Sequence, residues 1–411
     1  MAAHRSRLPL AIAGAVLAAG LATVVLRPRA GLIEPAAVEA TAYFSAAQLE
    51  RAGDFRDLQR ILGLAGTAVG GLVVAWIALR PPTRLRDVLG RAGRRPLLGG
   101  AAVAIGLGLA VTVAELPLAL WRHERAVDFG LSTQSLGSWL GDVAKATGVS
   151  TVYAAIGGLA AMALLRRFPR HWWLPGAGLV VAAAAVTLYV QPVLIDPLFN
   201  RFEPLRQGQL RSDVLRLADR AGVEVGEVYR VDASRRTTAI NAYVTGLGET
   251  KRVVLYDNLI DDYPRGQVLS VVAHELSHVE NRDVPRALLW IAIVAPAGLL
   301  LVQRLAERLA GGELVGPARP GPRALPAVVL AFAIVSFALG SAGTVLSRDV
   351  EARADAFALR LTEDPESFVE LSRSLAIRNL GDPDPPRLYH VLFGTHPTTL
   401  ERIGYGVAFE R

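Results

Sequence analysis

Seven long stretches without a charged residue constrain the fold of this chain more than any other feature. Each is close to the ~17–25 residues that an α-helix needs to cross the hydrocarbon core of a bilayer. Backbone polar groups must be paired internally in lipid, and a helix does this within one segment. The sequence therefore predicts a mostly α-helical, multi-pass membrane protein with seven spans. The stretches are 8–26, 61–79, 96–114, 146–165, 172–195, 287–303 and 324–347.

The first of these stretches could belong either to a signal peptide or to a membrane anchor. Arg5 and Arg7 precede it, as positive charge does in both cases. No small-residue cleavage site is evident before Arg27, and the apolar run is long for the core of a signal peptide. We expect an uncleaved anchor.

Composition agrees with a membrane protein and excludes some chemistry. Hydrophobic residues make up 52% of the chain, and the mean hydropathy is +0.35. The net charge of +7 comes almost wholly from arginine, and we interpret it as loop charge beside membrane helices, with no nucleic-acid partner. Because the chain has no cysteine, disulfides and thiolate catalysis are excluded.

The pentad His274-Glu275-Leu276-Ser277-His278 lies in an apolar run that predicts a buried helix. Positions i and i+4 share a helical face, so both imidazoles point at one spot. Zinc binds neutral imidazole, and a catalytic zinc keeps one position open for a water whose pKa it lowers. Glu275 is placed to take a proton from that water. With only 7 His in 411 residues, we interpret the pentad as the centre of a zinc peptidase with one Zn²⁺ per chain.

Glu351 is the candidate for the third zinc ligand. It lies just after the seventh uncharged stretch, whereas the pentad lies just before the sixth, so two crossings return the chain to the same membrane face. Asp355, one turn further along the expected helix, could accept the second ring N–H of a ligand histidine. His396 and His390 are weaker alternatives, and His390 is expected in a loop after two prolines.

Composition divides the chain near residue 200. Residues 1–200 are expected to form a membrane domain with five spans. Residues 201–411 are expected to form the zinc peptidase domain, which includes the sixth and seventh spans. Within it, 240–245 and 252–256 read as the two strands of a β-hairpin.

Several motifs in the same order resemble the type I CAAX prenyl proteases, a family of integral-membrane zinc metallopeptidases. The matching segments are 191–202, 241–243, 246–248, 253–257, the pentad, Glu351 with Asp355, 396–397 and 401–403. The resemblance implies a seven-helix membrane barrel around a large chamber, capped by a zincin-like (gluzincin) peptidase domain. It also implies that His274, His278 and Glu351 bind zinc and that Glu275 is the general base.

The resemblance assigns roles to four further residues. Asp355 would be a proton donor or an orienting carboxylate, and its place beside the ligands favours the orienting role. Asn241 would hold the backbone of the peptide substrate, next to a strand edge with which an extended peptide can pair. His396 and Arg402 would stabilise the oxyanion or support the site.

Three functions are compatible with these residues. The first is an endopeptidase that cuts hydrophobic or lipidated, CAAX-like substrates. The second is a membrane quality-control metallopeptidase. The third is a non-enzymatic transporter with a structural zinc, against which Glu275 argues.

Of the 44 basic residues only Lys145 and Lys251 are lysines, a bias that favours a bacterial chain and hence the inner membrane.

The distribution of basic residues and the family resemblance predict opposite orientations in the membrane. The N-terminus and the even-numbered loops carry 15 basic residues against 8 in loops one and three, which predicts that the peptidase domain lies outside the cell. The resemblance implies instead a site that faces the cytosol.

Overall fold

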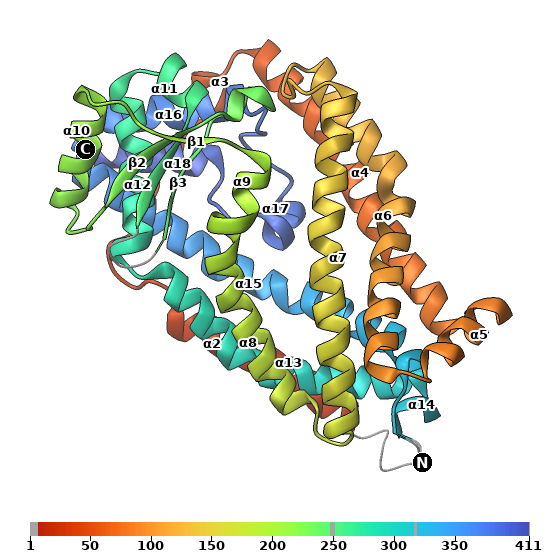
Figure 1. Ribbon diagram of the computed structural model, residues 1–411. Coiled ribbons are helices and arrows are strands. Elements are labelled where there is room, and N and C mark those ends of the chain that lie inside the picture. The colour runs from red at the N-terminus through yellow and green to blue at the C-terminus, as the bar shows by residue number, and fades with distance from the viewer. Residues whose placement is uncertain (1–6, 247–250, 316–318, 411) are drawn as a thin grey trace.

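Seven long helices dominate the computed structural model, which describes residues 7–246, 251–315 and 319–410 (Figure 1). All seven are long and apolar enough to span a membrane, which confirms the predicted number of spans. They are α2 (Arg7–Leu26), α4 (Ala46–Leu79), α6 (Pro96–Asp128), α7 (Leu136–Arg167), α8 (Trp173–Val190), α13 (Asp283–Ala310) and α15 (Leu325–Thr362). The fifth span continues beyond α8 through a π-helical turn, η1 (Gln191–Ile195), into α9 (Asp196–Phe199).

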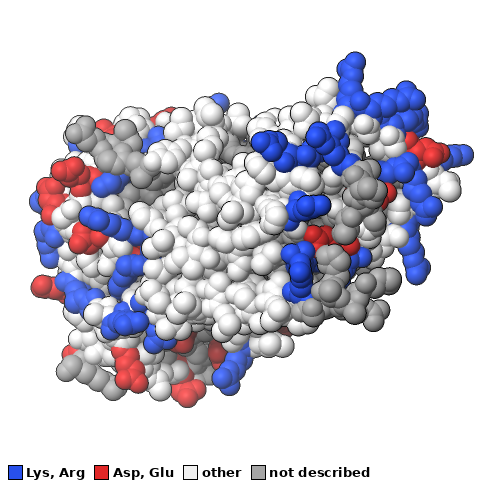
Figure 2. All heavy atoms as spheres, turned by 90° about the horizontal axis from the view of Figure 1, so that it is seen from below, with Lys and Arg blue, Asp and Glu red and all other residues white. Residues whose placement is uncertain are grey.

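The seven helices pack as a ring. α8 packs on α13, α13 on α2 and α15, α15 on α4, α4 on α6, and α6 on α7. The outward faces carry exposed apolar side chains such as Leu17 (70% exposed) and Leu72 (69%), which suits contact with lipid tails. Seen from below, a broad band without charged side chains crosses the molecule, and charges gather towards its two ends (Figure 2).

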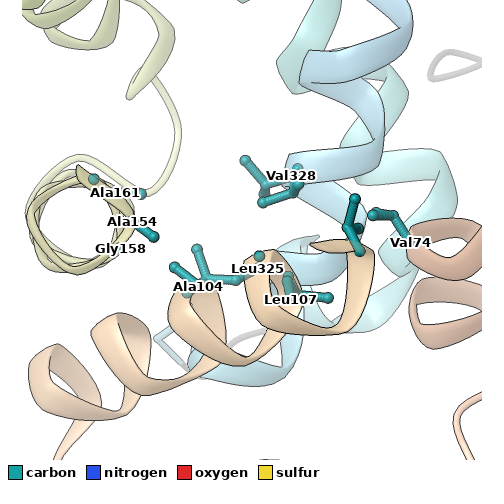
Figure 3. Close-up of a pocket in the computed structure, with 12 residues that line it drawn as sticks. Val74, Ala104, Leu107, Ala154, Gly158, Ala161, Leu325 and Val328 are labelled. Carbon is teal, nitrogen blue, oxygen red and sulfur yellow. The ribbon is translucent and has the colours of Figure 1, made fainter. Parts of the chain in front are cut away.

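Small residues allow close helix contact within the ring. A Cβ added at Gly158 of α7 would stand 2.5 Å from the carbonyl oxygen of Gly100 on α6, so only glycine permits this approach. The same scarcity of large side chains leaves an apolar cavity of about 390 Å³ between α4, α6, α7 and α15. Figure 3 shows Ala104, Leu107 and Val328 bordering it from α6 and α15.

The region expected to form the peptidase domain, called the peptidase region below, lies at one end of the ring and contains a four-stranded sheet of order β1-β2-β4-β3. The strands are β1 (Phe202–Pro204), β2 (Glu227–Val231), β3 (Ala242–Thr245) and β4 (Arg252–Tyr256). β3 and β4 pair antiparallel as predicted. The sheet is larger than the expected hairpin, because β2 adds in parallel to β4 and β1 pairs antiparallel with β2. The predicted turn of the hairpin falls mostly on 247–250, outside the described residues.

Helices pack around this sheet and enclose a core. Val228, Val253 and Leu255 of the sheet and Val272 and Leu276 of the pentad helix are fully buried in one cluster. The helices of this region are α10 (Gln209–Arg220), α11 (Asp257–Asp262), α12 (Arg265–Glu280), α16 (Pro365–Arg378), α17 (Arg387–Phe393) and α18 (Thr399–Phe409), with a short 3₁₀ turn, η2 (Ala233–Arg235). The connections of the membrane region contain α3 (Ala40–Tyr43), α5 (Thr83–Ala92), α14 (Gly312–Val315) and η4 (Pro322–Ala324).

One prediction of local structure was wrong. His390 was expected in a loop, but it lies on α17, which begins directly after Pro386. Two adjacent prolines suggest a break, yet a proline immediately before the first turn costs no hydrogen bond, because the N–H groups there have no partner within the helix.

Candidate metal centre

The pentad helix α12 brings two histidines and a glutamate together. It is buried along the apolar face formed by Val268, Val272 and Leu276, which fixes its rotation about its own axis. The rings of His274 and His278 stand edge to face with their centroids 5.0 Å apart. One potential ligand atom each from His274, Glu275 and His278 lies within 4.8 Å of the others. This helix therefore presents a group of the size that one metal ion requires.

Glu351 reaches the same point from α15. Its Oε2 lies 3.0 Å from His274 Nε2, and its Oε1 lies 3.7 Å from His278 Nε2. Ligand atoms about 2.05 Å from a tetrahedral zinc are separated from one another by about 3.3 Å. The observed separations bracket that value. The two imidazoles and the carboxylate thus fit a zinc site with three protein ligands.

Each histidine is held through its other ring nitrogen by a carboxylate. His274 Nδ1 donates to Asp355 Oδ1 at 2.8 Å, the contact expected of an orienting Asp355. His278 Nδ1 donates to Asp283 Oδ2 at 3.1 Å. With Nδ1 protonated in both rings, both Nε2 lone pairs point at the place shared with Glu351, as in carboxylate–histidine–zinc arrangements.

Asp283 is the residue of the site that the sequence analysis missed. It begins α13, and the turn before it is made by Arg282 in a left-handed conformation (φ 54°), which folds Asp283 back towards His278. A carboxylate five residues beyond the second histidine is the signal that could have identified it. Periodicity alone gave no reason to expect it, because the two residues lie on different helices.

Arginines donate hydrogen bonds to both carboxylates, Asp355 and Asp283, and hold them in place. Arg402 donates to Asp355 from Nε at 2.9 Å and from Nη2 at 2.8 Å, a bidentate pair that fixes the carboxylate plane. Asp283 Oδ1 accepts from Arg286 Nη1 at 2.7 Å and also from Arg353. Arg402 therefore lies against Asp355. Of its two expected roles, oxyanion stabilisation and support of the site, this position corresponds to support.

The start of α18 explains how Arg402 is aimed. Thr398 and Glu401 form a capping box, in which Thr398 Oγ1 accepts from the Glu401 N–H and Glu401 Oε2 accepts from the Thr398 N–H. This fixes the first turn of the helix, so Arg402 in the next position faces Asp355.

Glu275 lies beside the candidate ligands. Burial raises the pKa of its carboxyl group above the ordinary value, although the charges of His274, His278 and Arg402 act in the opposite direction. A raised pKa makes a carboxylate a stronger base, which suits proton abstraction from water.

His396 approaches the centre from the segment between α17 and α18. Its Nε2 lies 3.2 Å from Glu351 Oε2, and its Nδ1 lies 2.9 Å from Thr395 Oγ1. Its side chain is 56% exposed, so it borders the open side of the centre. Burial of part of the ring lowers its pKa, which favours the neutral form. His390 makes no such contact in the described part of the chain, and its carbonyl accepts from Arg348 instead.

Asn241 stands at the entrance to the edge strand of the sheet. Its carbonyl accepts from the Tyr256 N–H at 3.1 Å, and its Oδ1 accepts from the Ala242 N–H at 2.9 Å. Because antiparallel pairs alternate, the backbone groups of Ala242 and Val244 point away from β4, towards the free edge. β3 also contacts α12, the helix that carries His274 and His278.

Comparisons with known proteins identify the family and the fold. Residues 204–405 match the model of peptidase family M48, and residues 39–201 match the model of the CAAX prenyl protease N-terminal region with five membrane helices. The metalloprotease YhfN of Bacillus subtilis is 34% identical over 300 residues, which is 72% of this chain and 70% of that protein. CAAX prenyl protease 1 of Saccharomyces cerevisiae is 27% identical over 315 residues, 71% of this chain and 68% of that one. The crystal structure of S. mikatae Ste24p superposes with a TM-score of 0.72 at 21% identity and covers 97% of both chains, a likeness of fold.

Proposed function

This chain belongs to the M48 peptidases of the CAAX prenyl protease type and is a membrane metalloprotease, and from that premise we propose how its site works and what it cuts. His274, His278 and Glu351 hold one zinc ion, and Glu275 is the general base. The observation that carries this assignment is the 3.0 and 3.7 Å spacing of the Glu351 oxygens from the two Nε2 atoms.

Each residue of the site has a separate role in peptide hydrolysis. A bound zinc supplies a water of lowered pKa and polarises the scissile carbonyl. Glu275 takes a proton from the attacking water and passes it to the leaving nitrogen as the peptide bond breaks. Asp355 and Asp283 keep both histidines in the Nε2-ligating tautomer. His396, on the open side, donates to the oxygen of the scissile carbonyl as negative charge develops on it.

An extended peptide binds along the edge of β3. Val244 offers an outward N–H and an outward carbonyl, and Ala242 offers its carbonyl while its N–H donates to Asn241 Oδ1, so a substrate strand can pair there with little dependence on its side chains. The exposed Asn241 lies at the end of this edge and extends the contact to the peptide backbone. Selectivity for side chains then depends on the surroundings of the strand.

The substrates are hydrophobic or lipidated peptides. Support comes from the apolar cavity between α4, α6, α7 and α15 (Figure 3), which is too poor in polar groups to hold water well. Val328 at this cavity and Glu351 are 23 residues apart on one continuous helix, which corresponds to about 35 Å. A substrate that fills both places therefore spans about ten extended residues.

The competing functions differ in substrate and in chemistry. A quality-control peptidase would use the same residues on misfolded membrane proteins, so only its substrates distinguish it. A transporter with a structural zinc has no use for a base at Glu275, and membership of a peptidase family argues against the transporter function.

A substrate trap tests the proposal. Glu275→Gln should retain zinc, lose peptide hydrolysis and accumulate uncleaved substrates, whose C-terminal sequences identify the class. Glu280→Gln is the matched control, because Glu280 is an exposed carboxylate at the end of the same helix. Equal peptidase activity in the wild type and in Glu275→Gln would overturn the assignment. Accumulation of unrelated misfolded membrane proteins would favour quality control.

We place the protein in a bacterial inner membrane. The described N-terminus, α5 and α14 lie at the end opposite the peptidase region (Figure 1), so one label at each end determines the orientation. The chain has no cysteine, so Arg84→Cys and Glu224→Cys can be probed singly with an impermeant maleimide on spheroplasts. Labelling of position 224 alone would place the metal centre outside the cytosol, as the arginine distribution predicts.

A further inference from the structure

The end of the helix ring remote from the metal centre is strongly basic. The segments 80–95, 166–170 and 304–323 contain three acids, Asp87, Glu307 and Glu313. Their arginines are Arg80, Arg84, Arg86, Arg91, Arg94, Arg95, Arg166, Arg167, Arg170, Arg304, Arg308, Arg319 and Arg323. Figure 2 shows Lys and Arg gathered at this end, beside the uncharged band.

A pocket of about 530 Å³ opens within this basic end, a size typical of ligand sites. Four arginines line it: Arg95 directly before α6, Arg166 and Arg167 at the end of α7, and Arg319 in the connection before α15. No acid is among its described lining residues. The rest of the lining is apolar and consists of Pro96, Leu97, Leu98 and Ala163.

The positive charge of this pocket is not neutralised within the described chain. None of its four arginines forms an ion pair there, whereas Arg304 nearby is paired with Glu307 at 2.8 Å. Arg166 donates to the Pro320 carbonyl at 3.3 Å, and the Arg167 guanidinium lies 5.0 Å from the centroid of the Phe168 ring. These contacts orient the two side chains and leave their charge available to an anion.

The pocket straddles the boundary of the hydrocarbon core. The uncharged stretch of α6 begins at Pro96, one residue after Arg95, and that of α7 ends at Leu165, one residue before Arg166. The arginines therefore lie at the level of the lipid headgroups. Leu97 (45% exposed) and Leu98 (58%) lie just inside, at the level of the first methylenes of an acyl chain.

We propose that this pocket binds an anionic phospholipid of the surrounding bilayer. The phosphate accepts hydrogen bonds from the guanidinium groups, and an acyl chain runs along Leu97, Leu98 and Ala163. A lipid is the occupant because a free phosphate would leave the apolar half of the pocket unfilled, and a nucleic acid could not reach below the headgroup level. The site is independent of the peptidase chemistry.

Lipid retention in nanodiscs tests the proposal. The protein is purified from mixed phosphatidylglycerol and phosphatidylcholine nanodiscs, the bound lipid is identified by native mass spectrometry, and unfolding temperatures are compared in discs of each lipid. We expect retained phosphatidylglycerol and a higher unfolding temperature in its presence. The triple variant Arg95→Gln, Arg167→Gln, Arg319→Gln should weaken retention by about 100-fold, at roughly fivefold for each arginine.

Two further variants distinguish lipid binding in this pocket from unspecific attraction by the positive charge of the basic end. Arg80→Gln, Arg84→Gln, Arg91→Gln removes the same charge from the same end outside the pocket and should retain the lipid. Ala163→Trp fills the apolar half while every arginine remains, and it should release the lipid. Equal losses in both triple variants, retention by Ala163→Trp, or equal stabilisation by inorganic phosphate alone would each overturn the proposal.

Discussion

Replacement of Asp283 by asparagine should weaken zinc binding without removing any ligand. Asparagine keeps the shape of the side chain but cannot hold the His278 Nδ1–H by charge across the 3.1 Å contact. Loss of such a supporting carboxylate typically lowers metal affinity by about 10- to 100-fold. That range corresponds to about 1.4–2.8 kcal/mol of binding free energy.

The same change should also lower the free energy of unfolding. Arg353 and Asp283 are both buried, with 10% and 8% of their side chains exposed, and the guanidinium would lose its carboxylate partner. Removing one member of a buried pair costs up to about 3–5 kcal/mol, and an amide oxygen that still accepts reduces this cost. Zinc affinity and stability must therefore be measured separately.

A matched control makes that separation possible. Asp142 pairs with Arg236 at 2.8 Å in a similarly enclosed position, with 17% and 18% of the two side chains exposed, and it forms no hydrogen bond or ion pair with a histidine of the described chain. Asp142→Asn should lower stability and leave zinc affinity unchanged in competition titrations against a chromophoric chelator. If Asp283→Asn binds zinc within twofold of the wild type, the supporting role of Asp283 is refuted.

Three further predictions address the rest of the site. His396→Ala should lower kcat by about 10²–10³-fold with zinc affinity retained, and loss of zinc with normal turnover per bound ion would contradict a donor role. Val244→Pro removes an outward N–H of the edge strand and should raise KM for peptides, whereas Val244→Ala, which keeps it, should not. In the metal-free chain, burial lowers the pKa of His274, but the carboxylates of Asp355 and Glu351 raise it by more, so the net shift is upward. Zinc must then displace a proton, and its affinity should rise by about tenfold per pH unit below that pKa; a flat profile in titrations at several pH values would contradict the coupling.

The sequence predicted those parts of the structure that depend on local pattern. Uncharged length identified all seven spans, and the i, i+4 spacing of His274 and His278 identified residues that the structure groups in the candidate metal centre. Counting two membrane crossings was enough to bring Glu351 to the same face. Both features can be read from sequence because the pitch of a helix and the thickness of a bilayer are each nearly constant.

Other features depend on contacts between distant segments, which no local pattern reports. The parallel pairing of β2 with β4 joins two strands between which β3 lies in the sequence. The strand β1 has only three residues, and its extended structure depends on its pairing with β2. The position of the Asp283 carboxylate depends on the left-handed turn at Arg282 and on hydrogen bonds from two arginines that lie on different helices. The roles of Asn241, His396 and Arg402 remain predictions, to which the structure adds positions and partners.

The unbroken helix α15 has a mechanical consequence. Leu325 at its start and Glu351 are 26 residues apart, about 39 Å, with no proline between Pro326 and Glu351 to act as a hinge. When a helix of that length tilts as one body about one end, its far end moves by about 1.4 Å for each 2° of tilt, which is large compared with the tolerance of a metal–ligand bond. Long helices change tilt to match the thickness of the bilayer. Vesicles of increasing acyl-chain length should therefore reveal an optimum membrane thickness for catalysis, set by the angle at which the carboxylate meets the two imidazoles.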